Sequence, residues 1–267
     1  MSANAAGSAP LLHARDGRGV HTLTLNRPGS FNALSEDMLA ALQTALDAVA
    51  ADRAARVLVI AAAGTAFCAG HNLKEMRAQP ELAYYQALFA QCTRMMLTIQ
   101  KLPVPVIARV QGLATAAGCQ LVAQCDLAVA ASEASFGVNG IDVGLFCSTP
   151  SVPLSRNIPA KQAMEMLLTG AFITADEARV RGLVNRVVPV AALDVEVEKL
   201  LQTLLLKPAQ ALALGKALFY RQRETGMEAA YQLAGQTMAC NMIDPLAQEG
   251  VQAFIEKRKP QWPAAPA

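Results

Sequence analysis

The sequence is poor in charge, in aromatic side chains and in histidine, and these shortages exclude several classes of function. Charged residues make up 16% of the 267 residues, and 23 Lys and Arg stand against 21 Asp and Glu. No concentrated basic patch occurs, which argues against nucleic acid as a partner. Two of the three histidines, His13 and His21, fall in one predicted hairpin, where we expect them on the strand surface. We therefore predict no metal site.

Several well-known motifs and segments are also missing. The sequence has no G-x-G-x-x-G, no G-x-x-x-x-G-K-[ST] and no G-x-S-x-G. No apolar run reaches the roughly 18 residues of a membrane span, so we expect no membrane partner. The first ten residues lack the basic start and the apolar stretch of a secretion signal, and we expect residues 1–10 to form a flexible tail.

The six cysteines lie mostly in apolar runs and show no C-x-x-C spacing. In a chain of this length such cysteines do not indicate a disulfide scaffold. We therefore predict reduced thiols and a cytoplasmic location. Apolar residues make up 53% of the chain, which is high for a monomer, so we expect a homo-oligomer that covers part of this surface.

Two turns built of small residues are the most informative feature of the sequence. Each follows a short apolar run that predicts a buried parallel strand: Val57–Ala63 precedes residues 64–76, and Pro105–Val110 precedes residues 111–120. Gly and Ala let a ligand approach the backbone, and N–H groups at a helix start are unpaired donors. Two such donors from separate turns can form an oxyanion hole.

The remaining pattern predicts an α/β fold with a helical C-terminal part. Apolar spacing indicates helices from Ser35 to about Ala51 and over Glu81–Leu102, and they alternate with buried strands. From Val190 onward the chain is predicted to be helical, with breaks at prolines and glycines. We place a boundary near Leu200, between a core over residues 11–200 and a helical oligomerisation region over residues 201–267.

The sequence of the first turn resembles that of a known family. The segment AFCAGHNLKEM, residues 66–76, is similar to the AFxAGxDLxEM segment of the crotonase superfamily, the acyl-CoA enzymes that include enoyl-CoA hydratase. Further matches follow in chain order: Leu25–Pro28, Asn32–Leu34, Lys101–Pro105, Gly118–Leu121, Cys125–Asp126, Phe136–Gly137, Leu168–Gly170, Ala175–Ala178 and Gly182–Val184. The resemblance implies a spiral of ββα repeats whose C-terminal helices build trimers, commonly paired into hexamers.

The resemblance also implies a binding site for an acyl-CoA, with no cofactor beyond the coenzyme A moiety of the substrate. The backbone N–H groups of His71 and Ala117 would hold the thioester oxygen, and the His71 imidazole would be passive, line the acyl pocket or act on substrate. Phe254 and Lys257 would reach a neighbouring subunit's coenzyme A, although core packing is an equal alternative for Phe254. The expected contacts with the pantetheine and nucleotide are Ser30, Phe31, Ala33, Ala69, Asn72 and Leu73.

The chain departs from the hydratase pattern at both catalytic carboxylates. Gln120 and Gly140 stand where hydratases of the family carry glutamates, and neither can exchange a proton near neutral pH. We therefore expect weak or absent classical hydration. Asp142 and Cys147 are candidate replacements. The thiol could be a nucleophile or an acid, and the alternative that we favour is a buried cysteine that packs as a small apolar residue.

Three functions remain open. The first is an enzyme of the lyase or isomerase class that stabilises an enolate-like intermediate of a CoA thioester. The second is a non-catalytic homologue that binds acyl-CoA as a carrier or regulator. The third, an RNA-binding protein of the same fold, receives no support from the near-neutral charge.

Overall fold

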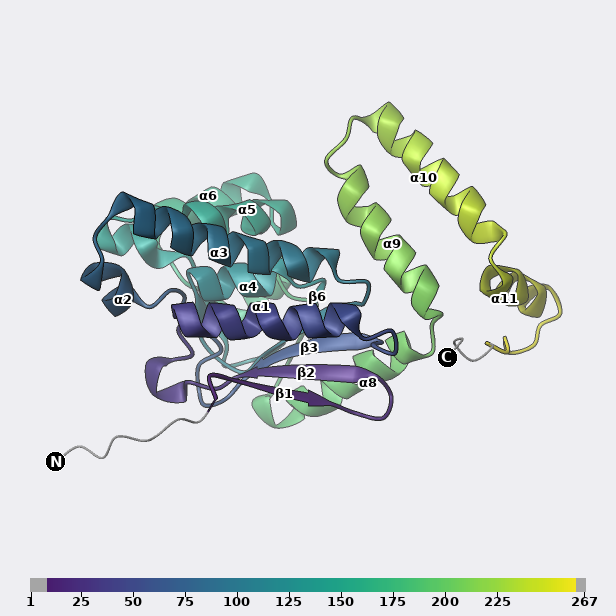
Figure 1. The fold of residues 1–267 in the computed structure, drawn as a ribbon, viewed down its shortest axis with the longest axis horizontal. Helices are drawn as coiled ribbons and strands as arrows, with labels where there is room; N and C mark the ends of the chain where they lie inside the picture. The colour runs from purple at the N-terminus through teal and green to yellow at the C-terminus, as the bar shows by residue number, and fades with distance from the viewer. Residues whose placement is uncertain (1–8, 263–267) are drawn as a thin grey trace.

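A computed structural model describes residues 9–262 (Figure 1). All but the last two residues of the predicted flexible tail, residues 1–10, lie outside the described residues. The strands are β1 (Leu11–Arg15), β2 (Val20–Leu25), β3 (Val57–Ala62), β4 (Val106–Val110), β5 (Ala114–Thr115), β6 (Leu127–Ala131), β7 (Ser135–Gly137), β8 (Ile173–Thr174) and β9 (Arg186–Val188).

The described helices alternate with these strands and then continue alone. They are α1 (Glu36–Ala51), α2 (Leu73–Ala78), α3 (Leu82–Lys101), α4 (Ala117–Gln124), α5 (Ser148–Asn157), α6 (Ala160–Thr169), α7 (Ala175–Arg181), α8 (Leu193–Leu205), α9 (Ala209–Gln222), α10 (Met227–Met242) and α11 (Pro245–Ile255). Three short 3-10 helices are η1 (Pro28–Ser30), η2 (Asn139–Val143) and η3 (Val190–Ala192).

Six strands form one sheet in the order β1-β2-β3-β4-β6-β9. β1 runs antiparallel to β2, and the other neighbouring strands are parallel. The predicted hairpin and the predicted parallel strands are therefore confirmed. A smaller sheet has the order β5-β7-β8. Its first strand, β5, lies within the second small-residue turn. Parallel strands deliver the loops at their carboxyl ends to the same edge of a sheet, and here they bring both small-residue turns together.

The middle of the large sheet is buried on both faces. All six residues of β3 are buried, and the first four alternate between two apolar clusters. Leu58 and Ile60 face the cluster that contains α1, α3 and α4, whereas Val57 and Val59 face α8 on the other side (Figure 1). Burial on both faces explains why this strand is continuously apolar in sequence rather than alternating.

Local capping residues fix the helix starts that the sequence predicts. The Ser35 hydroxyl accepts a hydrogen bond of 3.2 Å from the Met38 N–H at the start of α1. Thr174 and Glu177, three residues apart, form a reciprocal capping box at the start of α7, the spacing typical of such a box. The sequence analysis did not identify α2, a six-residue helix whose first turn is capped by Asn72.

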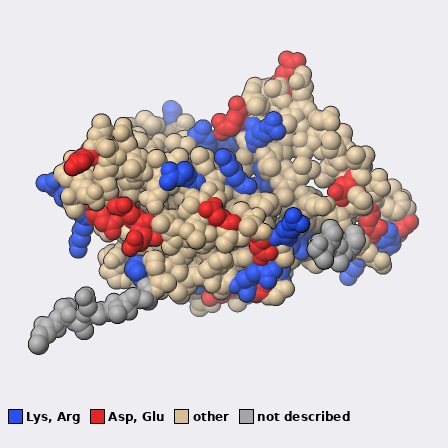
Figure 2. Space-filling model, viewed as in Figure 1, with Lys and Arg blue, Asp and Glu red and all other residues tan. Residues whose placement is uncertain are grey.

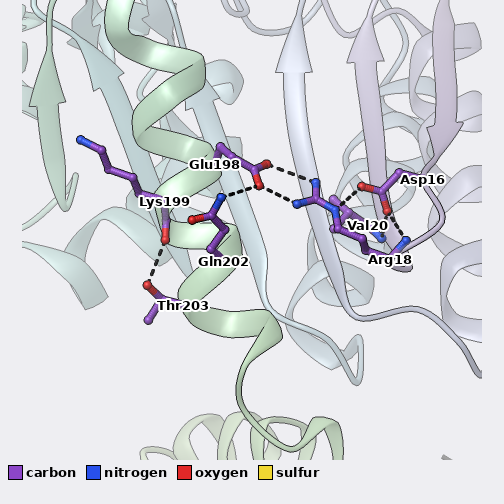
Figure 3. A network of polar contacts seen from close by, with 7 residues as sticks. All are labelled: Asp16, Arg18, Val20, Glu198, Lys199, Gln202 and Thr203. Carbon is purple, nitrogen blue, oxygen red and sulfur yellow. Dashed lines mark hydrogen bonds and ion pairs between the residues drawn. The ribbon is translucent and has the colours of Figure 1, made fainter. Parts of the chain in front are cut away.

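Helix α8 belongs to the core and is fixed to it by charge as well as by apolar packing. Glu198 pairs with Arg18 in the turn between β1 and β2, and the Arg18 Nε atom also donates to Asp16 at 2.8 Å (Figure 3). The predicted boundary at Leu200 falls inside α8, and Leu200 itself packs in the apolar cluster against the sheet. The part of the described chain that leaves the sheet begins with α9.

Helices α9 and α10 project from the core side by side, and α11 follows at the far end (Figure 1). Neither α9 nor α10 contains a buried residue. Their exposed large apolar side chains include Phe219, Met227, Tyr231 and Met238. On the face seen in Figure 2 the surface over these helices is mostly uncharged. An extended apolar surface of this kind is unusual for a monomer.

A buried ion pair fastens α9 to the core. The Lys216 ammonium lies 2.7 Å from Asp126 Oδ2, and it donates to the carbonyls of Ile99 and Val104 at 2.9 and 3.0 Å. The Tyr220 hydroxyl donates to the other Asp126 oxygen at 2.8 Å. The ammonium thus has a partner for each of its three hydrogens, which is the condition under which a charge can be buried.

Hydrogen bonding also corrects one expectation about the histidines. His13 is exposed, as expected, but His21 is only 3% exposed, so its expected place on the strand surface is wrong. The end of α1 covers it: its Nε2 atom lies 3.0 Å from Asp52, the residue that caps α1. Its Nδ1 atom lies 2.9 Å from His13 Nε2, and Arg15 Nε donates to the same Asp52 oxygen at 2.7 Å.

Replacing Lys216 by Met should lower the free energy of unfolding by about 3 kcal/mol, because two carbonyls lose their donor and Asp126 loses its cationic partner, keeping only the Tyr220 hydroxyl and the Val106 N–H. Chemical denaturation of the two proteins measures this change. Lys199→Met is the matched control, because Lys199 pairs with Glu196 at the surface and its loss should change the stability little. Equal effects of the two substitutions would contradict the importance of the buried pair.

Stability should also fall as the pH is lowered through about 6.5. Partial burial, and then the neighbouring His21, lower the pKa of His13 below its usual 6.5. The unfolded chain therefore takes up a proton at a higher pH than the folded one, so the free energy of unfolding decreases below pH 6.5. His13→Gln should make this decrease shallower between pH 7.5 and 5.5 in denaturant titrations. An unchanged slope would show that His13 is not responsible.

Candidate functional site

The two small-residue turns are joined by backbone hydrogen bonds. The Phe67 and Cys68 N–H groups both donate to the Leu113 carbonyl, at 2.9 and 3.1 Å. In return, the Thr115 N–H donates to the Cys68 carbonyl at 3.0 Å. These bonds continue the parallel pairing of β3 and β4 beyond the sheet, so the second half of each turn starts from a fixed position.

Glycine is required where the turns touch. A Cβ atom on Gly118 would lie 2.0 Å from the Cys68 carbonyl oxygen, a separation that no real side chain tolerates. Gly70 has a φ of +88°, and a Cβ on it would lie 3.1 Å from the Ala117 backbone nitrogen. The residue before His71 therefore lies directly against the first residue of α4. The two backbone amides that the sequence analysis singles out come from adjoining segments.

Both amides are available as donors. Ala117 is the first residue of α4, a position without an intrahelical acceptor. Among the described residues, the N–H groups of His71 and Ala117 make no backbone hydrogen bond outside the regular elements. Ala116 precedes the helix with φ 50° and ψ −121°, a strained conformation for a residue with a side chain. Strain of this kind is concentrated at functional sites.

A cavity of about 370 Å³ opens beside these amides. Its walls are mostly apolar, and small polar groups are few. It is lined by Ala69, His71, Leu73, Met76, Phe89, Thr115, Ala116, Ala117, Asn139, Gly140, Val143, Leu145, Phe146, Cys147, Ser148, Thr149 and Pro150. A mostly apolar hollow with a few convergent polar groups is typical of small-molecule sites.

His71 lines the cavity, and its imidazole is buried beside it. Its ring packs edge-on against Phe89, with the centroids 5.5 Å apart and the planes at 70°. Both ring nitrogens are buried, and the Leu34 backbone lies close enough to the ring to act on it by hydrogen bonding. Burial lowers the pKa of His71, and the Leu34 backbone opposes this effect only in part, so the ring is neutral at pH 7.

The two positions at which the resemblance implies glutamates differ in their surroundings. Gln120 is 4% exposed in α4, its Oε1 atom is buried without a partner, and it is not among the residues that line the cavity. Gly140 lines the cavity, but a Cβ there would lie 2.3 Å from the Leu145 carbonyl oxygen and 2.8 Å from Cys147 Sγ. The loop around Gly140 therefore leaves no room for a longer side chain.

The two candidate replacements are separated by the structure. Cys147 lines the cavity as the residue before α5, and its sulfur accepts a hydrogen bond of 3.3 Å from the Gly140 N–H. Burial raises its pKa, which keeps it a thiol. Asp142 is exposed and is not part of the cavity wall. Its carboxylate lies against Gly170, where a Cβ would meet Oδ1 at 2.8 Å.

The expected coenzyme A contacts fall into two groups. The segment of Ser30, Phe31 and Ala33 runs along the first turn: the Ala69 N–H donates to the Phe31 carbonyl at 3.0 Å. Just beyond, the Leu34 N–H donates to the Gly70 carbonyl at 2.7 Å. Ala69 and Leu73 line the cavity, and Asn72 between them caps α2 by accepting from the Lys74 N–H.

Phe254 and Lys257 lie apart from this group. Phe254 belongs to α11 and Lys257 follows it, at the end of the molecule opposite α2 (Figure 1). Phe254 is 85% exposed, so core packing within this chain does not explain it. Neither residue lines the cavity beside His71 and Ala117 within one chain.

The sequence analysis missed several residues of the cavity wall. Phe89 falls within the predicted helix over Glu81–Leu102, and helical spacing does not distinguish a core from a cavity. Thr115 and Asn139 are linked by a hydrogen bond of 2.6 Å between their side chains across the wall. Only Thr115 carried a signal, since it lies within the second turn.

The described residues contain neither a metal cluster nor a transmembrane helix. In residues 9–262, no three His, Cys, Asp or Glu side chains lie together as a metal site would require. No helix in that range combines the length and the hydropathy needed to cross a bilayer.

Known proteins resemble the chain over nearly its whole length. A sequence profile of the enoyl-CoA hydratase/isomerase family matches residues 15–265. Enoyl-CoA hydratase domain-containing protein 3, mitochondrial, from Xenopus laevis is 45% identical over 95% of this chain and 86% of its own length. The human protein of the same name is 44% identical over 95% and 84%. A crystal structure of enoyl-CoA hydratase from Mycobacterium smegmatis is 63% identical, with a TM-score of 0.94, over 96% and 99%.

These comparisons confirm the fold expectation and correct the location. The mixed α/β architecture with a helical C-terminal region is that of the crotonase superfamily. The expectation of a cytoplasmic protein is wrong on this evidence, because the curated relatives from Xenopus laevis and Homo sapiens are named mitochondrial. Mitochondrial transit segments are amphipathic rather than strongly apolar, so the lack of an apolar N-terminal stretch could not distinguish the two compartments.

Gly140→Ala should lower the free energy of unfolding by about 2 kcal/mol, because the added Cβ overlaps the Leu145 carbonyl. Gly235→Ala in α10 is the control, since nothing lies within 4 Å of its added Cβ. The control should be neutral or stabilising by up to about 1 kcal/mol. Denaturant titration measures both, and a Gly140→Ala protein as stable as the wild type would show that the loop can move aside.

Proposed function

Since this chain belongs to the enoyl-CoA hydratase/isomerase family, we propose that it binds an acyl-CoA thioester and stabilises an enolate-like intermediate of that thioester. The backbone amides of His71 and Ala117 receive the thioester oxygen. The single observation that carries this proposal is the close approach of the two turns, with both amides unpaired beside an apolar cavity.

The cavity fits the acyl chain, and the neighbouring segment fits the coenzyme A moiety. Leu73, Met76 and Phe89 offer apolar contacts for hydrocarbon. The nucleotide and pantetheine lie along the segment of Ser30, Phe31 and Ala33, which is hydrogen-bonded to the first turn. No cofactor beyond this moiety is needed for the chemistry proposed here.

The reaction differs from two-glutamate hydration. Gln120 supplies an amide, and Gly140 supplies no side chain and has no room for one. Water activation by a carboxylate pair is therefore absent, and the enolate-stabilising amides remain. We infer a lyase or isomerase whose substrate reacts beside the thioester without a carboxylate pair. Installing glutamates at both positions should not create efficient hydration, because Gly140 cannot accept the change.

The helical region over residues 201–267 serves assembly in this proposal. The exposed apolar surface of α9 and α10 is covered in a homo-oligomer, either a trimer or a hexamer. Phe254 and Lys257 then reach the coenzyme A of a neighbouring subunit, which agrees with their distance from the cavity of their own chain.

A non-catalytic acyl-CoA carrier or regulator is the second candidate function. The observation that favours it is again the closed loop at Gly140, which removes one of the two positions for a catalytic carboxylate. The two candidates share the ligand and the oxyanion hole, and turnover separates them.

Ala117→Pro tests the oxyanion hole. Proline removes the amide hydrogen at the first position of α4, where helices tolerate proline. Wild-type protein should shift the absorption of bound 2,4-hexadienoyl-CoA to longer wavelength, and Ala117→Pro should lose most of this shift. Turnover of any substrate should fall about 100-fold or more, because one such donor contributes about 3 kcal/mol.

The matched control is Ala160→Pro, which introduces proline at the exposed first position of α6. It should bind and polarise the dienoyl ester as the wild type does. Thermal melts establish that both variants fold. If Ala117→Pro keeps the full spectral shift, the Ala117 amide does not hold the thioester oxygen.

A further inference from the structure

We propose that the side-chain amides of Asn32 and Gln111 position the oxyanion hole. Neither side chain lines the cavity beside His71 and Ala117, so both are positioning residues and do not touch the reacting atoms. Together they hold the first small-residue turn, which carries the His71 N–H, against the second. The inference rests on the proposed binding of a CoA thioester, and it identifies the side chains that maintain the geometry of that site.

Both side chains donate to the same carbonyl, that of Ala66 in the first turn. Asn32 Nδ2 donates to it at 2.9 Å, and Gln111 Nε2 donates to it at 2.9 Å as well. A carbonyl oxygen has two lone pairs and can accept both bonds. Asn32 follows β2, and Gln111 follows β4. The start of the segment that leads to His71 is therefore fixed from two different parts of the chain.

Each side chain also holds the backbone next to Ala66. Asn32 Nδ2 donates to the Ala63 carbonyl at 2.8 Å. Gln111 Nε2 donates to the carbonyls of Ala62 and Gly64 at 3.0 and 3.1 Å. Side-chain donors thus hold the chain at the end of β3 and just beyond it, where the strand pairing stops.

The position of Gln111 accepts only a donor. Three carbonyl oxygens surround Nε2, whereas Oε1 is buried and has no partner among the described residues. Native structures rarely leave a buried polar atom unpaired. The reverse orientation of the amide would place Oε1 against all three carbonyls. The backbone here is also close to the first turn, because a Cβ on Gly112 would lie 1.9 Å from the Thr65 carbonyl oxygen.

Asn32 holds a strained loop beside the first turn. Phe31 and Asn32 have φ values of 49° and 53°, which residues with a side chain rarely adopt. Asn32 is 0% exposed, its Oδ1 accepts from the Arg27 N–H at 2.8 Å, and its own N–H donates to the Arg27 carbonyl at 2.9 Å. The loop held in this way presents the Phe31 carbonyl to the Ala69 N–H, two residues before His71.

The two side chains therefore control how the backbone donors converge. The His71 N–H belongs to the first turn, and the Ala117 N–H belongs to the second, which begins at Gln111. An oxyanion hole polarises a carbonyl only when both donors reach its oxygen. Loss of the side-chain amides should therefore weaken polarisation of a bound thioester more than it weakens binding, since the apolar cavity wall stays the same.

The first test compares full-length wild type, Gln111→Met and Asn32→Leu, which keep the side-chain size and remove the donors. At saturation with 2,4-hexadienoyl-CoA, each variant should keep less than about half of the wild-type shift to longer wavelength. The Kd for hexanoyl-CoA, measured by calorimetry, should change less than about fivefold. The double variant should lose nearly the whole shift, because the Ala66 carbonyl then has neither donor.

Gln111→Glu adds a measurement that a purely structural role would not affect. A carboxylate at this position faces three carbonyl oxygens and repels them, whereas the protonated carboxyl group has an O–H that donates. Relative to the wild type at the same pH, the spectral shift should be small at about pH 8 and should grow as the pH falls toward about 5. The same titration, repeated at each pH, measures this change.

Asn157→Leu is the matched control. Asn157 Nδ2 donates to the carbonyls of Ala123 and Pro153 at 2.8 and 2.7 Å, at the end of α5, and the residue does not line the cavity. This variant should keep the full spectral shift, although it also loses two bonds to backbone carbonyls. Thermal melts establish that each variant is folded at the assay temperature. If Asn32→Leu is not, the two Gln111 variants decide the outcome.

Three results would overturn the proposal: a full shift in Gln111→Met, a shift in Gln111→Glu that does not respond to pH, and an equal loss of shift in Asn157→Leu. Failure of the proposed function is distinguishable from these results. It would appear in the wild type alone, as a lack of binding to any CoA ester or as binding without a spectral shift.

Discussion

The site depends on the contact between two backbones. Gly118 lies against the Cys68 carbonyl, and Gly70 lies against the start of α4. A side chain at either position would push the two turns apart. Parallel strands bring the turns to one edge of the sheet, and the hydrogen bonds among Cys68, Leu113 and Thr115 fix their register. The orientation of two amides is thereby set by main-chain geometry, and it does not depend on which side chains line the cavity.

In the proposed function, this separation between backbone and side chain lets the family's architecture remain while the reaction differs. The main-chain donors would be kept, whereas Gln120, Gly140 and Cys147 would differ from a carboxylate site in charge and in shape. At Gly140 the difference is steric as well as chemical, because Leu145 and Cys147 close over it. The loop is therefore closed around a residue without a side chain, and His71 lines the same cavity from the first turn.

Much of the fold could be predicted from local signals. Continuous apolar runs gave the parallel strands, and Ser35 and the pair of Thr174 and Glu177 marked helix starts, because these features act within a few residues. The burial of His21 could not be predicted, since it depends on the end of α1 covering the sheet. Location could not be deduced either, because reduced thiols are compatible with more than one compartment.

The candidate site could be predicted in part, where its features depend on local sequence. The turns and their glycines carried a signal, because the sequence must provide small residues where backbones touch. The distance of Asp142 from the cavity, the contact between Gly140 and Cys147 and the place of Phe89 in the wall arise from how η2, α3 and α5 pack. No pattern within one segment contains that information.

The ion pair between Lys216 and Asp126 has a consequence for the order in which the chain acquires its structure. Its two residues are 90 positions apart, and the ammonium also needs the carbonyls of Ile99 in α3 and of Val104 in the segment before β4. An unpaired charge cannot enter this pocket, so α9 can dock only after α3 and the segment before β4 have formed. Detachment of α9 exposes all these groups at once, so the C-terminal helices open as one cooperative unit rather than by fraying.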